Sequence, residues 1–466
     1  MPEQAQQHSW PLIQLTVAGA LQPLDVILRW PHDLPLACIL AADGAARWSI
    51  LALPNGDRGT FEAIFNRSFA VTAPNQHTPP FLGGWIGALS YEAGWDLDQG
   101  SMHRFRKSLA APQPRRSPFP RSIWLRCDDA LVFDHQNQTW WACGREGPSL
   151  WNRVNDVTHR AKTAHEVSSK STIHHAGVHL TPSSTESAYI EKVQRAKAYI
   201  RDGDAYQVNL AHTLEGAFAG CALNYFANRC AVAKPRYGAF MCFDETNGTD
   251  SILRHAIASL SPELFLEFDP VSRKLTTRPM KGTRQGGTDT TELIENIKDQ
   301  AELAMIVDLM RNDLGAVARL GSVQVEEART IEHHGASGAG GVVQATATIS
   351  GLLREDLTLL DAIKACFPCG SVTGAPKARA MQIIEELEDE PRGFYCGSMG
   401  FLSDTGAMRL NVAIRTMHIQ GTPASGDVHA FTIADAQYRV GAGVVADSSP
   451  QEEWAETLVK AGVVLV

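Results

Sequence analysis

The sequence predicts an α/β (α+β) fold in which many short strands are combined with helices in two regions of one chain. The chain has 466 residues, a length that suggests two domains or one large composite domain. Short stretches in its first part, such as ARWSILAL and DDALVFDH, are separated by turn residues and are typical of strands. Later in the chain, segments with helical spacing alternate with strand-like segments, which indicates a mixed architecture.

A polar stretch between the two regions predicts a linker over residues 146–184. It contains SSKSTIHHAGVHLTPSST, which is rich in Ser, Thr, Gly and Pro and lacks apolar periodicity. We therefore expect an N-terminal region over residues 1–145 and a second domain over residues 185–466.

Apolar residues at helical spacing predict a helix directly after this linker. Tyr189, Val193, Ala196 and Ile200 fall on one face, and a Ser/Thr cluster precedes them. The helix is expected to end at Asp202. A longer helix is predicted over residues 291–313.

The position of Glu302 on the longer helix points to a function. The predicted apolar stripe consists of Leu293, Ile297, Ala301, Ala304, Met305 and Leu309. At about 100° per residue, Glu302 lies at the edge of that stripe, close to Leu309. A glutamate with a purely solvent-facing role would more naturally lie opposite that stripe. Its carboxylate is therefore expected at the boundary of the buried face.

Alternation predicts two strands, and the second carries polar residues that could face a ligand. In AYQVNL, Gln207 and Asn209 share one face. In AMRLNVAIRT, strict alternation places Arg409, Asn411 and Arg415 together. That face could bind a carboxylate, since arginine offers a planar fork of donors. It could equally be a solvated face of a sheet.

Composition argues against several classes of function. The net charge is −9 and the pI is about 6.0, which disfavours a nucleic-acid groove because such grooves need clustered Lys and Arg. The first residues do not resemble a signal peptide, and an apolar run long enough to span a membrane is lacking. The nine cysteines are scattered and odd in number, which fits reduced thiols in a cytoplasmic protein. In CFPC, Cys366 and Cys369 are interpreted as ordinary packing.

The C-terminal helix, which opens SSPQEEWAETL, carries a second candidate site. Ser449, Pro450 and Glu452 form a capping box with proline at the first helical position. Glu453 and Glu456 are three residues apart and share a face. Paired carboxylates beside a pocket suit Mg²⁺, a hard cation that takes oxygen ligands, although such a pair can also be an acidic surface.

Several glycine-rich stretches, including CGSVTGAPK, GAGVV and KGT, could approach a small anionic ligand closely. Walker A and dinucleotide-binding fingerprints are lacking, as are the G-x-C-x-G and G-x-S-x-G elbows. We therefore expect neither a glutaminase nor a hydrolase nucleophile in this chain.

In this order the motifs resemble one family, the chorismate-utilising enzymes. The matching stretches are DAYQVNL, SLSPELFL, RPMKGTR, AELAMIVDLMRNDLG, FPCGSVTGAPKARAMQIIEELE, RGFYCGSMGFL, NVAIRT, YRVGAGVVADS and EEWAET. They cover residues 180–462 strongly and the N-terminal region weakly. The resemblance implies a large two-subdomain β-sandwich with helices outside, like that of anthranilate synthase component I, in which 185–466 is the chorismate-binding catalytic domain.

The resemblance also implies roles for individual residues. Mg²⁺ would be held by Glu302 and Glu456, with Glu453 close by, and Glu263 would be the general acid that protonates the departing 4-hydroxyl of chorismate. The positions that would surround the substrate are Gly282, Thr283, Ser371, Tyr395, Arg415, Gly441 and Gly443.

Two positions discriminate among members of the family. Gln207 occupies the place of a lysine that activates water in some members, which disfavours isochorismate and salicylate synthesis. Lys281 stands where anthranilate synthases have alanine, and a lysine before Gly-Thr resembles aminodeoxychorismate synthase component I. The implied role of Lys281 is a covalent nucleophile, made neutral by burial and by the neighbouring charges of Arg278, Arg284 and Mg²⁺. The alternative is a lysine that only pairs with a substrate carboxylate.

The resemblance also leads to expectations for Gln344 and Cys369. Gln344 aligns with a histidine of many members, and either Gln344 or the upstream His334 would fill that role. Cys369 stands where glycine is commoner and is interpreted as a tolerated packing change.

Ammonia would come from a separate glutamine amidotransferase subunit (component II), and the product would serve p-aminobenzoate and folate synthesis. Anthranilate synthase component I is the alternative within the family, and a non-catalytic scaffold is the alternative outside it.

Overall fold

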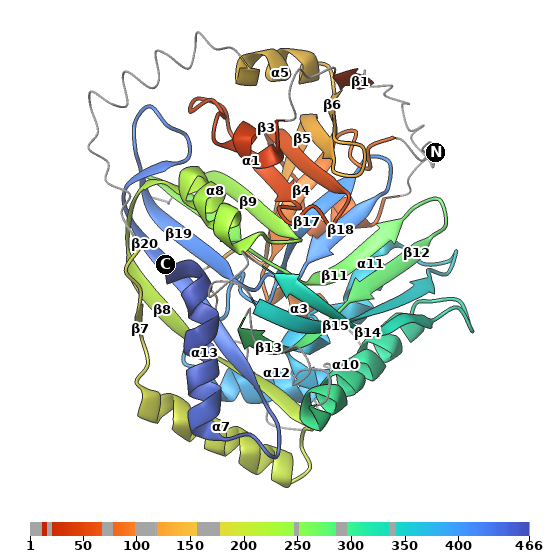
Figure 1. The fold of residues 1–466 in the computed structure, drawn as a ribbon, viewed down its shortest axis with the longest axis vertical. Coiled ribbons are helices and arrows are strands. Elements are labelled where there is room, and N and C mark those ends of the chain that lie inside the picture. Colours follow the sequence, from red (N-terminus) through yellow and green to blue (C-terminus); the bar gives the residue numbers. More distant parts are fainter. Residues whose placement is uncertain are drawn as a thin grey trace.

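The computed structural model describes residues 12–15, 21–67, 78–97, 117, 119–155, 178–246, 251–285, 296–334 and 342–465. Figure 1 shows long strands running through the middle of the molecule, with helices at its periphery. Every strand pair recorded for these residues is antiparallel, and the strands connect into one 20-stranded sheet system. The predicted α+β class is therefore confirmed.

The strands are β1 (Leu12–Leu15), β2 (Ala37–Leu40), β3 (Trp48–Arg58), β4 (Gly84–Leu89), β5 (Ser122–Asp134), β6 (Thr139–Cys143), β7 (Thr181–Pro182), β8 (Gln207–Cys221), β9 (Gly238–Thr246), β10 (Ile252–Ser259), β11 (Leu264–Asp269), β12 (Lys274–Arg278), β13 (Met280–Gln285), β14 (Gln324–His334), β15 (Val342–Leu352), β16 (Gly374–Ala375), β17 (Ser398–Ser403), β18 (Met408–Asn411), β19 (Thr416–Pro423) and β20 (Ala430–Val444). The helices are α1 (Pro23–Ile27), α2 (Phe61–Phe65), α3 (Ala93–Leu97), α5 (Gly147–Asn155), α7 (Glu186–Arg201), α8 (Ala222–Ala233), α10 (Ile297–Gly315), α11 (Leu359–Cys366), α12 (Lys377–Leu387) and α13 (Pro450–Leu465), with a short 3₁₀ helix, η1 (Gly370–Val372).

Strands from the N-terminal region pair directly with strands from the second half of the chain. β2 pairs with β9, and β4 pairs with β17, where Leu89 lies opposite Ser398. The aromatic side chains of Trp124 on β5 and Phe401 on β17 are buried. The two parts of the sequence therefore share a continuous hydrogen-bonded framework.

The helix predicted after the linker is confirmed as α7. Thr185 caps it by accepting a hydrogen bond from the Ala188 amide, and Asp202 is its C-cap residue. Tyr189, Val193 and Ala196 are buried, as their spacing predicted. Part of the predicted linker forms α5, and residues 156–177 lie outside the described part of the chain.

The longer predicted helix is α10, which begins after its N-cap Asn296; residues 291–295 lie outside the described part. Leu303, Ile306 and Met310 pack into the main hydrophobic cluster. Glu302 is partly buried, but the predicted stripe is wrong, because Ala301 and Ala304 are exposed and the buried face runs through Leu303, Ile306 and Met310.

The interpretation of residues 407–416 as one alternating strand is wrong. β18 ends at Asn411, and Arg415 has a left-handed backbone with φ of 51°. Arg409 forms an ion pair with Glu267, and the Asn411 amide donates to the Tyr237 carbonyl. Only Arg415 of the three polar residues therefore remains a candidate for binding a ligand.

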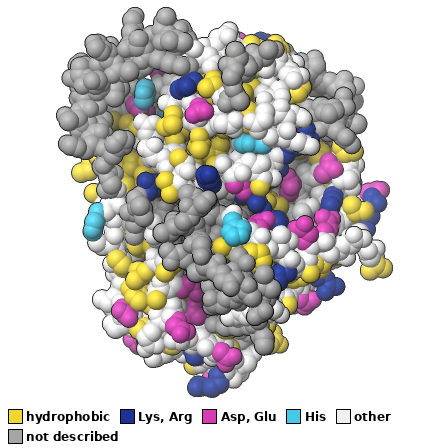
Figure 2. Space-filling model, in the orientation of Figure 1, with side chains coloured by type: hydrophobic (Ala, Val, Ile, Leu, Met, Phe, Trp, Pro, Cys, Tyr) yellow, Lys and Arg dark blue, Asp and Glu magenta, His cyan; other side chains and the backbone are white. Residues whose placement is uncertain are grey.

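The cysteines and the surface agree with a reduced, mixed-charge protein. All nine cysteines are free thiols, and Cys366 and Cys369 are buried. Within the described residues, none of the helices is long and apolar enough to cross a membrane. Figure 2 shows Lys and Arg side chains interspersed with Asp and Glu on the face in view, rather than gathered into one basic band.

Candidate active site

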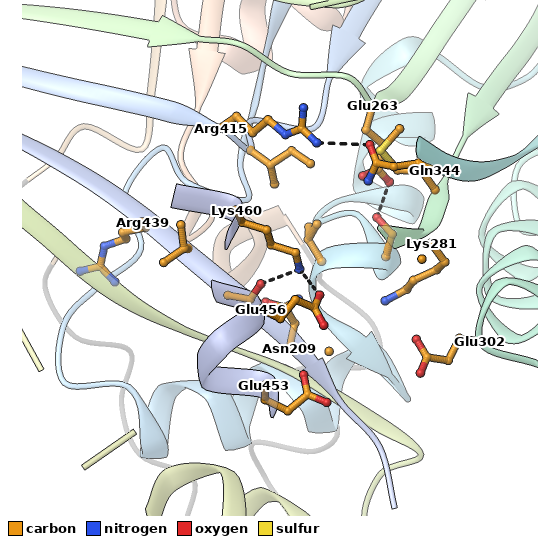
Figure 3. A pocket seen from close by; sticks show the side chains of 18 of the residues that line it. Asn209, Glu263, Lys281, Glu302, Gln344, Arg415, Arg439, Glu453, Glu456 and Lys460 are labelled. Carbon is orange, nitrogen blue, oxygen red and sulfur yellow. Dashed lines mark hydrogen bonds and ion pairs between the residues drawn. The ribbon is translucent and has the colours of Figure 1, made fainter. Parts of the chain in front are cut away.

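A cavity of about 330 Å³ lies where the long strands meet α10 and α13. Figure 3 shows side chains that line it, among them Lys281, Glu302, Glu456 and Lys460. We call Glu263, Lys281, Gln344, Ser371 and Arg415 the strand side of the cavity. We call Asp299, Glu302, Glu453, Glu456 and Lys460 the helix side, because α10 and α13 carry them.

Lys281 is placed on the cavity by a bulge in β13. Its backbone pairs with Ala345 on β15, but the register then shifts so that Thr283 pairs with Gln344. The extra residue is Gly282, whose φ of 69° is a conformation that glycine adopts at little cost. The glycine of the KGT motif therefore permits the strand irregularity that follows the lysine.

The amine of Lys281 lies close to the backbone of β20. A Cβ atom added to Gly443 would stand 3.2 Å from the Lys281 Nζ and 3.1 Å from the Gln207 Nε2. Burial lowers the pKa of Lys281 and the charge of Lys460 lowers it further, whereas Glu302 and Glu263 raise it. The cavity therefore favours a neutral amine more than water does.

The positive charge that lowers the pKa of Lys281 comes from a different residue than the sequence predicted. Arg278 is not among the main groups that shift the pKa of Lys281, and its guanidinium pairs with Glu332 at 2.5 Å. Lys460 is the cation that lowers the pKa of Lys281. The side chain of Arg284 lies outside the described part of the structure.

Glu263 is buried, with 2% of its surface exposed. Its backbone carbonyl accepts a hydrogen bond from the Val412 amide at 3.0 Å, and its amide donates to the Ser261 hydroxyl at 3.2 Å. The Ser371 hydroxyl donates to the Glu263 Oε1 at 2.5 Å. Burial raises the pKa of Glu263 to about 7, although Ser371 and Lys281 act in the opposite direction. This carboxyl group can therefore hold a proton near neutral pH.

Arg415 and Gln344 meet at the top of the cavity in Figure 3. Arg415 Nη2 donates to the Gln344 Oε1 at 3.3 Å. Burial lowers the pKa of Arg415, and the other contributions come from Tyr438 and Glu263. Beyond the bond to Gln344, the planar guanidinium of Arg415 offers further N–H donors, which suit it to bind a carboxylate.

The GAG segment of β20 forms another part of the wall. Gly441 lies opposite Ala211 on β8, and Gly443 lies opposite Asn209. A Cβ on Gly441 would be 2.6 Å from the Leu210 carbonyl and 2.9 Å from the Tyr395 hydroxyl. Glycine at this position therefore keeps the backbone close to its neighbours.

The helix side brings four carboxylates to one cavity. Glu302 and Asp299 come from α10, while Glu453 and Glu456 come from α13. Lys460 pairs with Glu456 at 2.7 Å and donates to the Gly441 carbonyl at 2.9 Å. In the described part of the chain, three or more acidic, histidine or cysteine side chains do not converge tightly enough to form a complete metal site. The oxygen donors nevertheless match the ligand type that Mg²⁺ prefers.

Most residues expected from the sequence line this cavity. They are Glu263, Lys281, Gly282, Glu302, Gln344, Ser371, Tyr395, Arg415, Gly441, Gly443, Glu453 and Glu456. Gln207 is fully buried and lies behind Gly443 rather than on the wall. Thr283 contributes described backbone in β13, but its side chain lies outside the described part.

Sequence reasoning missed several residues of the wall. They are Asn209, Met280, Asn296, Asp299, Val372, Ile414, Tyr438, Arg439, Val440 and Lys460. Two of them carried a usable signal: Asp299 is three residues before Glu302, and Lys460 is four residues after Glu456, so each shares a helix face with an expected residue.

A family model described as chorismate binding enzyme matches residues 41–466. The chain belongs to this family of chorismate binding enzymes. Its cavity, lined by both cationic and carboxylate groups, is thus the candidate active site of a chorismate-utilising enzyme.

Similar proteins within this family carry two different names. The chain is 34% identical over 393 residues to aminodeoxychorismate synthase component 1 of Escherichia coli, covering 83% of this chain and 77% of the relative. It is 34% identical over 414 residues to anthranilate synthase component 1 of Streptomyces coelicolor, covering 84% and 74%. Overall identity therefore does not separate the two activities.

The fold is also similar to a solved member of the family. The crystal structure of anthranilate synthase component I from Streptococcus pneumoniae matches with a TM-score of 0.68 and 27% identity, covering 96% of this chain and 98% of that one. The predicted likeness to anthranilate synthase component I is confirmed at the level of the fold.

Proposed function

We propose that this protein is an aminodeoxychorismate synthase component I, which converts chorismate and ammonia into 4-amino-4-deoxychorismate and water. The observation that carries this proposal is the position of Lys281 on the cavity wall, with a lowered pKa and its Nζ close to Gly443. A neutral amine at this place can act as a nucleophile toward a ring bound in the cavity.

In the proposed first step, the Lys281 Nζ forms a bond to C2 of chorismate. The ring double bonds shift, the bond from C4 to its hydroxyl oxygen breaks, and the proton of Glu263 leaves with that oxygen as water. Glu263 suits this role because its pKa of about 7 allows it to be protonated near neutral pH.

In the second step, ammonia bonds to C4 while the C2–N bond breaks and its electron pair returns to Lys281. The proton released by the added nitrogen restores Glu263. The lysine thus blocks C2 while ammonia enters at C4, which is the regiochemistry of aminodeoxychorismate.

The remaining residues of the strand side would hold the substrate. Arg415 is placed to pair with one carboxylate, with Gln344 fixing its guanidinium at 3.3 Å. Gly441 and Gly443 line the cavity and keep β20 close to Leu210, Gln207 and Lys281, so a flat ring would approach backbone there rather than side chains.

The helix side would hold Mg²⁺ through Glu302, Glu453 and Glu456, since carboxylate oxygens suit a hard cation. When bound, the ion would neutralise the ring carboxylate of chorismate. Asp299, on the same face of α10 as Glu302, would add negative charge nearby. The protein groups themselves perform the proton and nucleophile steps described above.

Ammonia would come from a separate glutamine amidotransferase subunit. Two observations support this: the chain lacks a nucleophile-elbow motif, and relatives on both sides of the family are named component 1. The product would then supply p-aminobenzoate and folate synthesis. Anthranilate synthase component I is the alternative function, which the lysine at position 281 disfavours.

Identification of the product tests the proposal directly. The purified chain is incubated with chorismate, Mg²⁺ and ammonium, and the products are separated and identified by mass spectrometry and ultraviolet absorption. We expect 4-amino-4-deoxychorismate. Anthranilate would establish the alternative, isochorismate would show attack by water, and lack of any turnover would support a non-catalytic role.

A further inference from the structure

Cys369 is connected to the proposed general acid through a single hydroxyl group. Its Sγ lies 3.2 Å from the Ser371 Oγ, and that hydroxyl donates to the Glu263 Oε1 at 2.5 Å. All three side chains are buried, with exposed fractions of 2%, 4% and 2%. The sequence alone suggested that Cys369 is a packing change at a place where glycine is commoner.

The single proton of the Ser371 hydroxyl sets the direction of these hydrogen bonds. A serine hydroxyl has one proton, and Ser371 gives it to Glu263. The contact with Cys369 therefore uses the S–H as donor and the Ser371 oxygen as acceptor. Burial raises the pKa of Cys369 to about 12, so the thiol keeps its proton near neutral pH.

The segment that carries Cys369 is held in place independently. The Thr373 hydroxyl donates to the Cys369 carbonyl at 2.8 Å. The neighbouring Gly370 leaves room for α10, since a Cβ there would lie 2.4 Å from the Leu309 Cδ2. The thiol thus faces Ser371 from a well-defined backbone.

We propose that Cys369 is a positioning residue for catalysis, which acts through Ser371 to fix where Glu263 carries its proton. Because Oε1 accepts from Ser371, the proton of the neutral acid is directed to the other oxygen, Oε2. A hydroxyl that accepts from the thiol is also a better donor, since hydrogen bonds in a chain polarise one another. This role rests on the proposed use of Glu263 as the acid.

The other groups that act on Glu263 come from several elements. Lys281 on β13 and Lys460 on α13 lower its pKa, and the Met280 amide adds a backbone hydrogen bond with the same effect. Arg415 and Cys396 also interact electrostatically with Glu263. These groups are unchanged by a substitution at Cys369, so its contribution can be isolated.

The test compares Cys369→Ala and Cys369→Ser with wild type by the pH dependence of kcat for chorismate consumption. Loss of the thiol weakens the Ser371 donor, which raises the pKa of Glu263. We expect kcat of Cys369→Ala to fall about three- to ten-fold, as for one lost hydrogen bond, with little change in KM. The alkaline limb of the pH profile of kcat should move to higher pH by about half a unit. Cys369→Ser keeps a hydrogen-bond donor and should restore much of the wild-type kcat and of the wild-type pH profile.

Cys366→Ala is the matched control, because Cys366 belongs to the same CFPC segment and packs in the hydrophobic core. A double-mutant cycle gives the second control: in a Ser371→Ala background, Cys369→Ala should produce no further pH shift. An infrared difference spectrum of wild type minus Cys369→Ala should show an S–H band at the low frequency of a hydrogen-bonded thiol.

An unchanged pH profile in Cys369→Ala would overturn the proposal. A fall in kcat that Cys369→Ser does not reverse, or an S–H band at the frequency of a free thiol, would assign Cys369 to packing alone. Chorismate consumption is followed whatever the product, so a finding of anthranilate would overturn the proposed function while leaving this test intact.

Discussion

On the strand side of the cavity, Glu263 is buried and accepts a hydrogen bond from Ser371 at 2.5 Å, whereas Arg415 is partly buried and donates to Gln344 at 3.3 Å. Desolvation shifts the pKa of each away from its ordinary value. On the helix side, Glu302 is only partly buried, and the side chain of Glu456 is 46% exposed beside Lys460. Desolvation therefore shifts the pKa of Glu263 and Arg415 on the strand side. On the helix side Asp299 and Glu453 are buried, but Glu302 and Glu456 remain open to solvent and ions. The comparison suggests that the strand side selects the reaction and the helix side supplies the charge that binds the substrate.

The largest expected effect comes from removing the nucleophile on the strand side. Lys281→Ala should lower the formation of aminodeoxychorismate by at least about a thousand-fold, since the covalent route is lost. Ammonia could then reach C2, so anthranilate is the product to look for among the residual turnover. The measurement is product analysis by chromatography with mass spectrometry.

Lys274→Ala provides a control on the neighbouring strand β12, where Lys274 pairs with Glu326 outside the cavity. It should keep wild-type product and rate. Wild-type synthesis of aminodeoxychorismate by Lys281→Ala would reduce the lysine to an electrostatic contact and remove the proposed division between the two sides.

The helix side should respond to magnesium instead. Glu302→Gln keeps the shape of the side chain but removes a charged oxygen ligand, so the Mg²⁺ concentration for half-maximal activity should rise about ten-fold or more. Calorimetric titration of Mg²⁺ into the chain gives a second reading that does not depend on turnover. Asp308→Asn, an exposed acidic position on the same helix with a side chain that is 81% exposed, is the matched control.

The same variant should also change the pH dependence, with a definite sign. Glu302 raises the pKa of Lys281, so its neutralisation lowers that pKa further. The neutral amine then persists to lower pH, and the acidic limb of kcat at saturating Mg²⁺ should move downward. An acidic limb that moves upward, or an unchanged magnesium requirement, would contradict this placement of Glu302.

Local signals in the sequence accounted for much of this site, because several residues lie on regular helices or follow recognisable motifs. Pro450 and the Ser/Thr cluster before Tyr189 marked true helix starts. Glu302 is partly buried as expected, although the buried face of α10 is not the predicted stripe. Arg415 could not be placed by alternation, since its left-handed backbone interrupts the strand pattern. Lys460 was missed because a lysine on a C-terminal helix is ordinarily a surface residue.

Long-range pairing was also beyond sequence patterns. The pairing of β2 with β9 and of β4 with β17 depends on contacts between residues far apart in the chain, which local periodicity does not encode. The bulge at Gly282, which follows the lysine, depends likewise on the register between β13 and β15. The resemblance to a family supplied what these local rules could not.

A smaller effect is expected at the contact between Gln344 and Arg415. Gln344→Ala removes the acceptor that orients the guanidinium at 3.3 Å, so KM for chorismate should rise about five- to ten-fold, as for loss of a hydrogen bond to a charged group. His334→Ala is the comparison, because either residue could fill the family's histidine role. Steady-state kinetics in which His334→Ala has the larger effect would transfer that role to His334.

The smallest effect is expected from adding a methyl group to Gly443 on β20, close to the amine of Lys281. In Gly443→Ala the new methyl group would lie 3.2 Å from the Lys281 Nζ and 3.1 Å from the Gln207 Nε2, both of which are ends of flexible side chains. A small displacement should suffice, so kcat should fall only about two- to five-fold while the thermal unfolding midpoint stays near that of wild type. In Gly441→Ala the methyl group would lie 2.6 Å from the Leu210 carbonyl, which is fixed by the pairing of β8 with β20. That variant should lose stability as well as activity, and equal behaviour of the two variants would show that the amine of Lys281 does not depend on the space above Gly443.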